Sequence, residues 1–189
     1  MLNYSGFAGQ SKEERVKTLE EQMAFYAAYH QDARNKATHF VGVPMIIASL
    51  FIPLAWLRVE VGGFALTGAM AFAAIVLAYY FVLDVALAAA TALATAALLA
   101  AGSWLASRGA AVGWAAFGAL FVGGWIIQLV GHAFEGRKPA LADNLFQIFI
   151  APIFLCAELF FALGYKLKLH AAVQERALKM RRKRGLDGG

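Results

Sequence analysis

The sequence has one cysteine and little charge. Cys156 is the only cysteine in 189 residues, which excludes an internal disulfide and a cysteine-cluster metal site, and we expect it to be a small buried apolar residue. Charged residues make up 15% of the chain and hydrophobic residues 61%, whereas a soluble domain has about 25% and about 45–50%. The excess lies between Phe40 and Leu163, which predicts a polytopic membrane protein with a single domain over 1–189.

Several motifs that would assign a function are also missing. There is no glycine-rich phosphate loop, no dinucleotide fingerprint and no GxSxG elbow. The HxxxH and HxxHH clusters of di-iron membrane hydroxylases are missing, and three histidines are too few for a di-iron site of that kind. The first 36 residues are polar, so we expect no secretory signal. The basic run KMRRKRG has no nucleic-acid-reading module beside it; next to a membrane segment it predicts contact with anionic headgroups, and we expect no nucleic-acid partner.

The apolar runs predict an all-α, polytopic membrane helical bundle over 38–165. Four segments have about the 20 apolar residues that a transmembrane helix needs. They cover residues 38–57, 64–83, 85–106 and 112–131. An amphipathic helix is expected before them over 11–29, where Ser11 and Glu14 form a capping-box pattern. A basic cytoplasmic tail is expected after them over 166–189.

A fifth apolar segment, 145–165, is predicted to be bent or re-entrant. If it crossed the membrane fully, the two basic ends of the chain would lie on opposite sides, whereas the positive-inside rule places both in the cytoplasm. The segment contains Pro152 and Glu158, and both a freed carbonyl and a charge are costly in lipid. Shielding inside the bundle and a plain fifth span are alternatives that remain open.

Three of the four histidines are expected on one membrane face. His30 and His39 flank the start of the first span, and His132 ends the fourth, so four crossings return the chain to its starting face. Neutral imidazoles that converge in this way form a metal or catalytic site. Residues nine apart point in nearly opposite directions on one helix, so the chain must break near 32–35, where Asn35 could cap the next helix.

The same face carries polar residues that could serve such a site. They are Glu135, Arg137, Asp143 and Asn144, together with Gln128, which lies one turn before His132 and could orient its ring. A structural interpretation stays open for all of them. The histidines could be hydrogen-bonded interfacial side chains, as we expect for His170, and the charged residues could bind headgroups or form ion pairs.

Two stretches resemble a known family. YHQDARNKATHFVGVP, residues 29–44, and GHAFEGRKPALADNLFQIFIAPIFLCAE, residues 131–158, are similar to a family of small membrane proteins that includes the 2-hydroxy fatty acid dioxygenases of phytosphingosine breakdown. The resemblance covers roughly residues 20–160. It implies an Fe(2+)-dependent α-oxidation in which a 2-hydroxy fatty acid reacts with O2, loses its carboxyl carbon and becomes a fatty acid one carbon shorter.

The resemblance also implies residue roles. The three histidines would be the iron ligands, and the expected carboxylate ligands or acid–base groups are Glu135, Asp143 and, less directly, Glu158. The substrate's carboxylate would meet Arg34, Asn35, Lys36 or Arg137, and Asp32, Gln128 and Asn144 would orient the ligands. The membrane would be a bacterial inner membrane or the endoplasmic reticulum, with the site and both termini cytoplasmic. A zinc-dependent lipid hydrolase and a non-enzymatic lipid-binding or transport protein are the alternatives.

Overall fold

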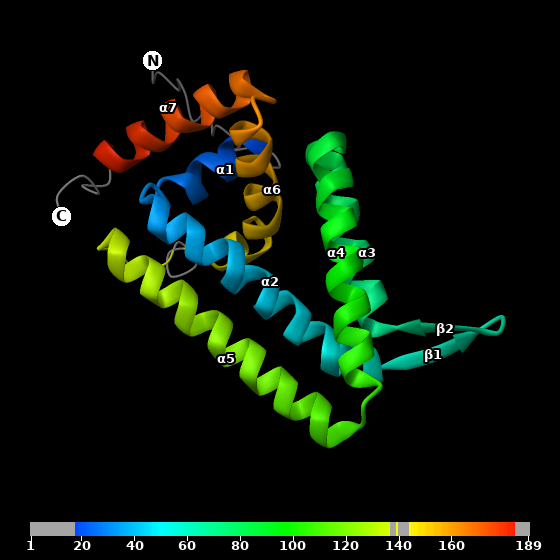
Figure 1. Ribbon diagram of the computed structural model, residues 1–189. Coiled ribbons are helices and arrows are strands. Elements are labelled where there is room, and N and C mark those ends of the chain that lie inside the picture. The colour runs from blue at the N-terminus through cyan, green and yellow to red at the C-terminus, as the bar shows by residue number, and fades with distance from the viewer. Residues whose placement is uncertain (1–17, 137–138, 140–143, 184–189) are drawn as a thin grey trace, which may run out of the picture.

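In the computed structural model, residues 18–136, 139 and 144–183 are described, and they are helical apart from one short hairpin (Figure 1). The helices form two groups. Helices α1 (Leu19–Ala27), α6 (Ala151–Ala162) and α7 (Leu167–Lys183) pack together at one end. From this group α2 (Ala33–Trp56) runs alongside α5 (Ala110–Glu135) towards α3 (Gly68–Leu83) and α4 (Val85–Ala106) (Figure 1).

The N-terminal helix α1 spans Leu19–Ala27 and is buried rather than interfacial. Met23, Ala24 and Ala27 have no exposed surface, because α1 packs against both α7 and α6. The prediction of one helix over 11–29 is wrong at Thr18, whose extended backbone (φ −64°, ψ 159°) starts a new helix with a capping box to Glu21. The predicted cap at Ser11 lies outside the described residues.

Helix α2, Ala33–Trp56, begins five residues before the predicted first span. The predicted break exists, but it lies between the end of α1 and Asp32. Asp32 caps α2 by accepting a hydrogen bond from Arg34 N, so the expectation that Asn35 caps this helix is wrong. Asn35 instead sits in the first turn with a fully buried side chain.

The second predicted span divides into a strand and a short helix. Strands β1 (Arg58–Val61) and β2 (Phe64–Thr67) form an antiparallel hairpin. Gly62 and Gly63 connect them, both with the positive φ that a two-residue hairpin turn requires. Thr67 then caps α3, Gly68–Leu83, whose 16 residues cover about 24 Å at 1.5 Å per residue. The start predicted at residue 64 was wrong because the glycine pair closes a hairpin first.

Three of the described helices are long and apolar enough to cross a membrane, namely α2, α4 and α5. Helix α4, Val85–Ala106, has the predicted bounds and is capped by Asp84. Helix α5, Ala110–Glu135, continues past the predicted end and stops at Gly136, which adopts the left-handed conformation. The prediction of four spans is therefore not confirmed, because α3 is shorter than the other three.

The fifth apolar segment is broken. A 3-10 helix, η2 (Leu145–Phe149), leads into α6 (Ala151–Ala162), which is only 12 residues long and carries Pro152 in its first turn. Gly164 and Lys166 have positive φ and turn the chain into α7, Leu167–Lys183. The predicted tail is thus mostly a folded helix.

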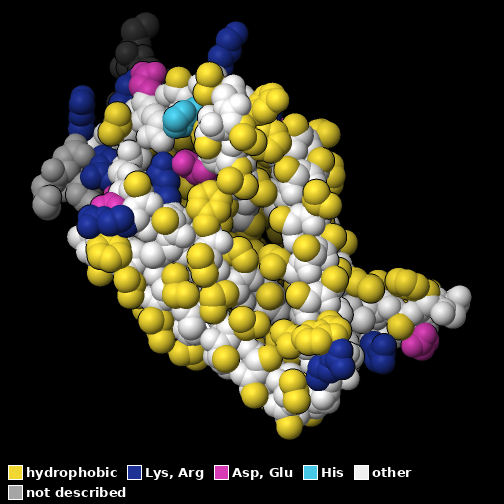
Figure 2. All heavy atoms as spheres, viewed as in Figure 1, with side chains coloured by type: hydrophobic (Ala, Val, Ile, Leu, Met, Phe, Trp, Pro, Cys, Tyr) yellow, Lys and Arg dark blue, Asp and Glu magenta, His cyan; other side chains and the backbone are white. Residues whose placement is uncertain are grey.

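The outer surface has an apolar middle between two charged zones. Charged side chains gather around α1 and α7 and again near the hairpin, and hydrophobic side chains cover the helices between them (Figure 2). Large apolar side chains on the long helices are exposed, including Leu93 at 78%, Trp104 and Trp114. A surface of this kind suits a hydrocarbon environment, so the protein is a membrane protein.

Glycines bring α2 and α5 into close contact. A Cβ on Gly124 would lie 2.9 Å from the carbonyl oxygen of Gly42, and a Cβ on Gly131 would collide with Thr38 Oγ1. Small residues permit this approach of two membrane helices. The crossing matters for function because α2 carries His39 and α5 carries His132.

We expect Gly124→Ala to lower the thermal unfolding midpoint of the detergent-solubilised protein, since overpacking costs about 1–3 kcal/mol. Gly118→Ala on the same helix is the matched control, because a Cβ there would meet nothing within 4 Å. The control should be unchanged or slightly more stable, given alanine's higher helix propensity. Equal midpoints for the two variants would contradict the close crossing.

Candidate metal centre

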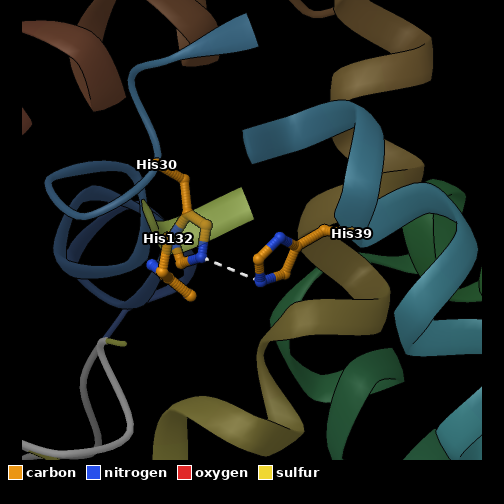
Figure 3. Close-up of side chains that lie close together, drawn as sticks. All are labelled: His30, His39 and His132. Carbon is orange, nitrogen blue, oxygen red and sulfur yellow. Dashed lines mark hydrogen bonds between the residues drawn. The ribbon is translucent and has the colours of Figure 1, made fainter. Parts of the chain in front are cut away.

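Three histidines from three parts of the chain meet in one buried cluster (Figure 3). His30 lies in the connection between α1 and α2, His39 in the second turn of α2, and His132 in the last turn of α5. Their candidate ligand nitrogens all lie within 4.8 Å of one another, and the residues are only 2%, 2% and 5% exposed. The topological count from the sequence placed these residues on one face, and the structure does bring them together.

Hydrogen bonds made by Nδ1 fix the tautomers of His30 and His39. His30 Nδ1 lies 2.8 Å from the carbonyl oxygen of Tyr26, and His39 Nδ1 lies 2.8 Å from that of Asn35. A carbonyl only accepts hydrogen bonds, so each Nδ1 carries a proton. In the neutral rings both Nε2 atoms then present lone pairs, and these face each other at 3.2 Å, along the dashed line of Figure 3.

Two facing lone pairs repel unless a proton or a metal ion lies between them. Burial, followed by the proximity of His39, lowers the pKa of His30 well below its usual value, which disfavours a proton. Tyr26 stacks on the ring of His30 with centroids 4.0 Å apart. His132 Nδ1 is buried without a hydrogen-bond partner among the described residues. Two neutral imidazoles, those of His30 and His39, are thus oriented by backbone carbonyls, which is the usual arrangement of metal-binding histidines.

Glu135 holds the connection that carries His30. Its carboxylate accepts hydrogen bonds from the backbone N–H groups of Gln31 (3.1 Å) and Asp32 (2.7 Å) and from Asn35 Nδ2 (3.3 Å). Arg181 of α7 completes the set through an ion pair at 3.3 Å, and the Glu135 side chain is 3% exposed. The carboxylate therefore faces the backbone of the connection, and its contacts are those of a structural anchor.

Lys36 and Arg34, two of the charged residues predicted to bind substrate, already have partners. Lys36 Nζ lies 2.9 Å from Glu158 Oε2, because the break before α6 lets that helix fold back beside α2. Arg34 is 65% exposed and pairs with Asp32, and this hydrogen bond lowers the pKa of Asp32 to about 2. Arg34 also lies over the ring of Phe134. The structure therefore places Glu158 against α2, although a straight fifth segment would have placed it far from this face.

The remaining predicted residues are more dispersed. Asn144 caps η2 by accepting from Phe146 N, and Gln128 lines the cavity beside the histidines. Arg137 and Asp143 lie outside the described residues. Gln147, a 1% exposed residue of η2 on the same cavity, is not among the residues predicted from the sequence. Its signal was a polar residue within the apolar run LFQIFIAP of the second motif.

The cluster opens into an apolar cavity of about 190 Å³. The lining begins at the three histidines and follows α2 from His39 to Phe51, twelve residues or about 18 Å of helix. Helices α3 and α5, the 3-10 helix η2 and the start of α6 supply most of the other walls. Figure 2 shows a hollow surrounded by hydrophobic side chains where α2, α4 and α6 meet. The described lining contains no Asp, Glu, Lys or Arg. Such a site suits a molecule with a small polar head and a long apolar tail.

Comparisons with known proteins agree with this geometry. Residues 16–163 match the family model described as 2-hydroxy-palmitic acid dioxygenase Mpo1-like. The chain is 31% identical over 177 residues to the 2-hydroxy-palmitic acid dioxygenase MPO1 of Saccharomyces cerevisiae, and the match covers 89% of this chain and 98% of the yeast protein. No solved structure matches the chain.

Proposed function

The chain belongs to the Mpo1-like family of 2-hydroxy-palmitic acid dioxygenases, and on this premise we propose that it is an Fe(2+)-dependent dioxygenase of 2-hydroxy fatty acids. The substrate would lose its carboxyl carbon by cleavage of the C1–C2 bond, and C2 would become the carboxyl carbon of the shorter acid. With CO2 and water as the other products, one O2 balances the reaction without a further reductant. This fits a sequence that has no nicotinamide or flavin motif.

The observation that carries the proposal is the pair of Nε2 lone pairs, on His30 and His39, that face each other in a buried site beside His132. Three neutral imidazoles fit a mononuclear iron site that keeps positions open. When bound there, Fe(2+) supplies the redox chemistry that lets O2 react with an organic substrate. The protein's own contribution is to fix the three rings, exclude bulk water and receive the acyl chain in the apolar cavity along α2.

The charge distribution supports a cytoplasmic site. Helix α7, which packs near the histidine cluster, carries Lys168, Arg176, Lys179, Arg181, Arg182 and Lys183. The opposite end of the described bundle has only Arg58 and Arg108 as basic residues. By the positive-inside rule, the histidine end and both termini would face the cytoplasm, from an inner membrane or the endoplasmic reticulum.

The direct test is oxygen consumption by the detergent-purified protein with 2-hydroxypalmitate, together with mass-spectrometric detection of pentadecanoate. We expect turnover with Fe(2+), and none with palmitate or after chelation. Adding Fe(2+) back should restore the activity, whereas Zn(2+) should not. Lipid cleavage with zinc and without oxygen consumption would instead indicate a hydrolase. No turnover and no bound metal would favour a lipid-binding protein.

A further inference from the structure

The side chain of Gln147 is a buried amide without a partner. The residue is 1% exposed, and neither Nε2 nor Oε1 has a hydrogen-bond partner among the described residues. It lines the same cavity as His30, His39 and His132. An unpaired buried amide costs about 1–3 kcal/mol, and native proteins seldom retain one without a purpose.

The backbone around Gln147 is well fixed. Asn144 caps η2 through its side chain and accepts a hydrogen bond from Gln147 N at 3.0 Å. At the other end of η2, the Tyr80 hydroxyl donates to the carbonyl oxygen of Phe149. The backbone that carries the amide is therefore fixed at the cavity wall, and a ligand that binds the amide does not have to order this segment.

The chemistry of an amide matches the head of a 2-hydroxy acid. Nε2 has two N–H donors and Oε1 is an acceptor, whereas a carboxylate only accepts and a hydroxyl can donate. The described cavity lining has no cationic side chain for the carboxylate, and Lys36 already pairs with Glu158. A neutral donor at the cavity wall is thus a suitable partner for the substrate's head.

We propose that Gln147 is a substrate-positioning and specificity-determining residue, whose Nε2 donates to the carboxylate of a 2-hydroxy fatty acid and whose Oε1 accepts from its 2-hydroxyl. The inference rests on the proposed function, because it takes that substrate class as given. A site that hydrogen-bonds a hydroxyl discriminates strongly against the analogue that lacks it, since a buried polar group then stays unpaired. Gln147 therefore contributes to the preference for 2-hydroxypalmitate over palmitate.

The test measures, by calorimetry, the equilibrium binding of 2-hydroxypalmitate and of palmitate to the full-length, Fe(2+)-loaded protein in the absence of oxygen. We expect Gln147→Leu to weaken 2-hydroxypalmitate binding roughly 10- to 100-fold, the value of a hydrogen bond to a charged group, and to change palmitate binding much less. Metal content should not change. The thermal midpoint should not fall, because leucine replaces an amide that has no partner in the protein.

Gln22→Leu is the matched control. Gln22 is also buried, at 5% exposure, but its Nε2 donates to Tyr79 Oη at 3.2 Å and it does not line the cavity. This variant should lose stability and keep the discrimination between the two acids. A second variant, Gln147→Glu, keeps the shape but places a negative charge beside the carboxylate. It should weaken 2-hydroxypalmitate binding at least as much as the leucine variant.

Two results would overturn the inference. One is unchanged discrimination in both Gln147 variants, which would mean that the amide binds only a water molecule. The other is a fall in the midpoint of Gln147→Leu as large as that of Gln22→Leu, which would indicate a structural hydrogen bond. Failure of the proposed function is distinguishable, because the wild-type protein itself would then show no preference between the two acids.

Discussion

His132→Ala is expected to remove the bound transition metal and to abolish turnover. Only His30, His39 and His132 form a group of three metal-ligating side chains among the described residues. Loss of one ring leaves two imidazoles, too few to hold Fe(2+) against detergent and buffer. Elemental analysis of the purified variant should show a fall from about one iron per chain to a small fraction, and oxygen consumption with 2-hydroxypalmitate should fall to background.

His170→Ala is the control for this experiment. His170 is the fourth histidine of the chain, and it stacks on Phe161 with centroids 4.5 Å apart, outside the cluster. Its removal should leave both iron content and turnover unchanged. Full iron occupancy and normal turnover in His132→Ala would remove that residue from the site. A loss in both variants would point to general misfolding instead.

Glu135→Leu is expected to destabilise the protein by about 3–5 kcal/mol, since it removes the buried acceptor of an ion pair and of several hydrogen bonds. The donors that would lose this acceptor are Arg181, Asn35 Nδ2 and the backbone N–H groups of Gln31 and Asp32. Leucine has nearly the same size as glutamate, so lost volume is a small part of the effect. The measurement is the thermal midpoint of the solubilised protein.

The same variant should also bind iron more weakly, because Glu135 anchors the connection that positions His30. Glu175→Gln serves as the control, as its pair with Lys179 is exposed at 67% and 70% and should contribute nothing measurable. An unchanged midpoint for Glu135→Leu would show that the carboxylate is not a structural anchor. Normal stability with lost activity would return Glu135 to the catalytic role that the family resemblance implies.

Features that extend over many residues of the sequence, such as long apolar runs, gave reliable predictions. The alanine-rich helix α4 has the predicted bounds, because Asp84 on one side and the Ser107-Arg108-Gly109 break on the other delimit an unbroken apolar run. The count of four crossings predicted that His39 and His132 lie on one face, and it depends on α3, because α2, α4 and α5 alone would give three crossings. The structure brings the two residues together directly, through the packing of α2 against α5.

Features that depend on single residues, such as turns, helix caps and the partners of charged side chains, gave less reliable predictions. The connection between Leu57 and Gly68 combines a hairpin with the start of a helix, since two consecutive glycines can close a type of turn that a hydropathy pattern does not detect. Asp32 and Asn35 are both good helix caps by type, and which of them acts depends on where the preceding helix stops. Glu135 and Glu158 were equally ambiguous, because their partners lie far away in the sequence, 46 to 104 residues from Glu135 and 122 residues from Glu158.

The sequence by itself determined the membrane class, the location of the long apolar helices, the family and the three histidines that meet. These depend on composition, on apolar runs and on motifs, which are properties of the chain read in one dimension. Only the tertiary structure decided the tautomers of His30 and His39, the anchoring role of Glu135 and the unpaired amide of Gln147. Each of these depends on which distant group lies within hydrogen-bonding distance of a buried polar atom, and only the packing of helices fixes that distance.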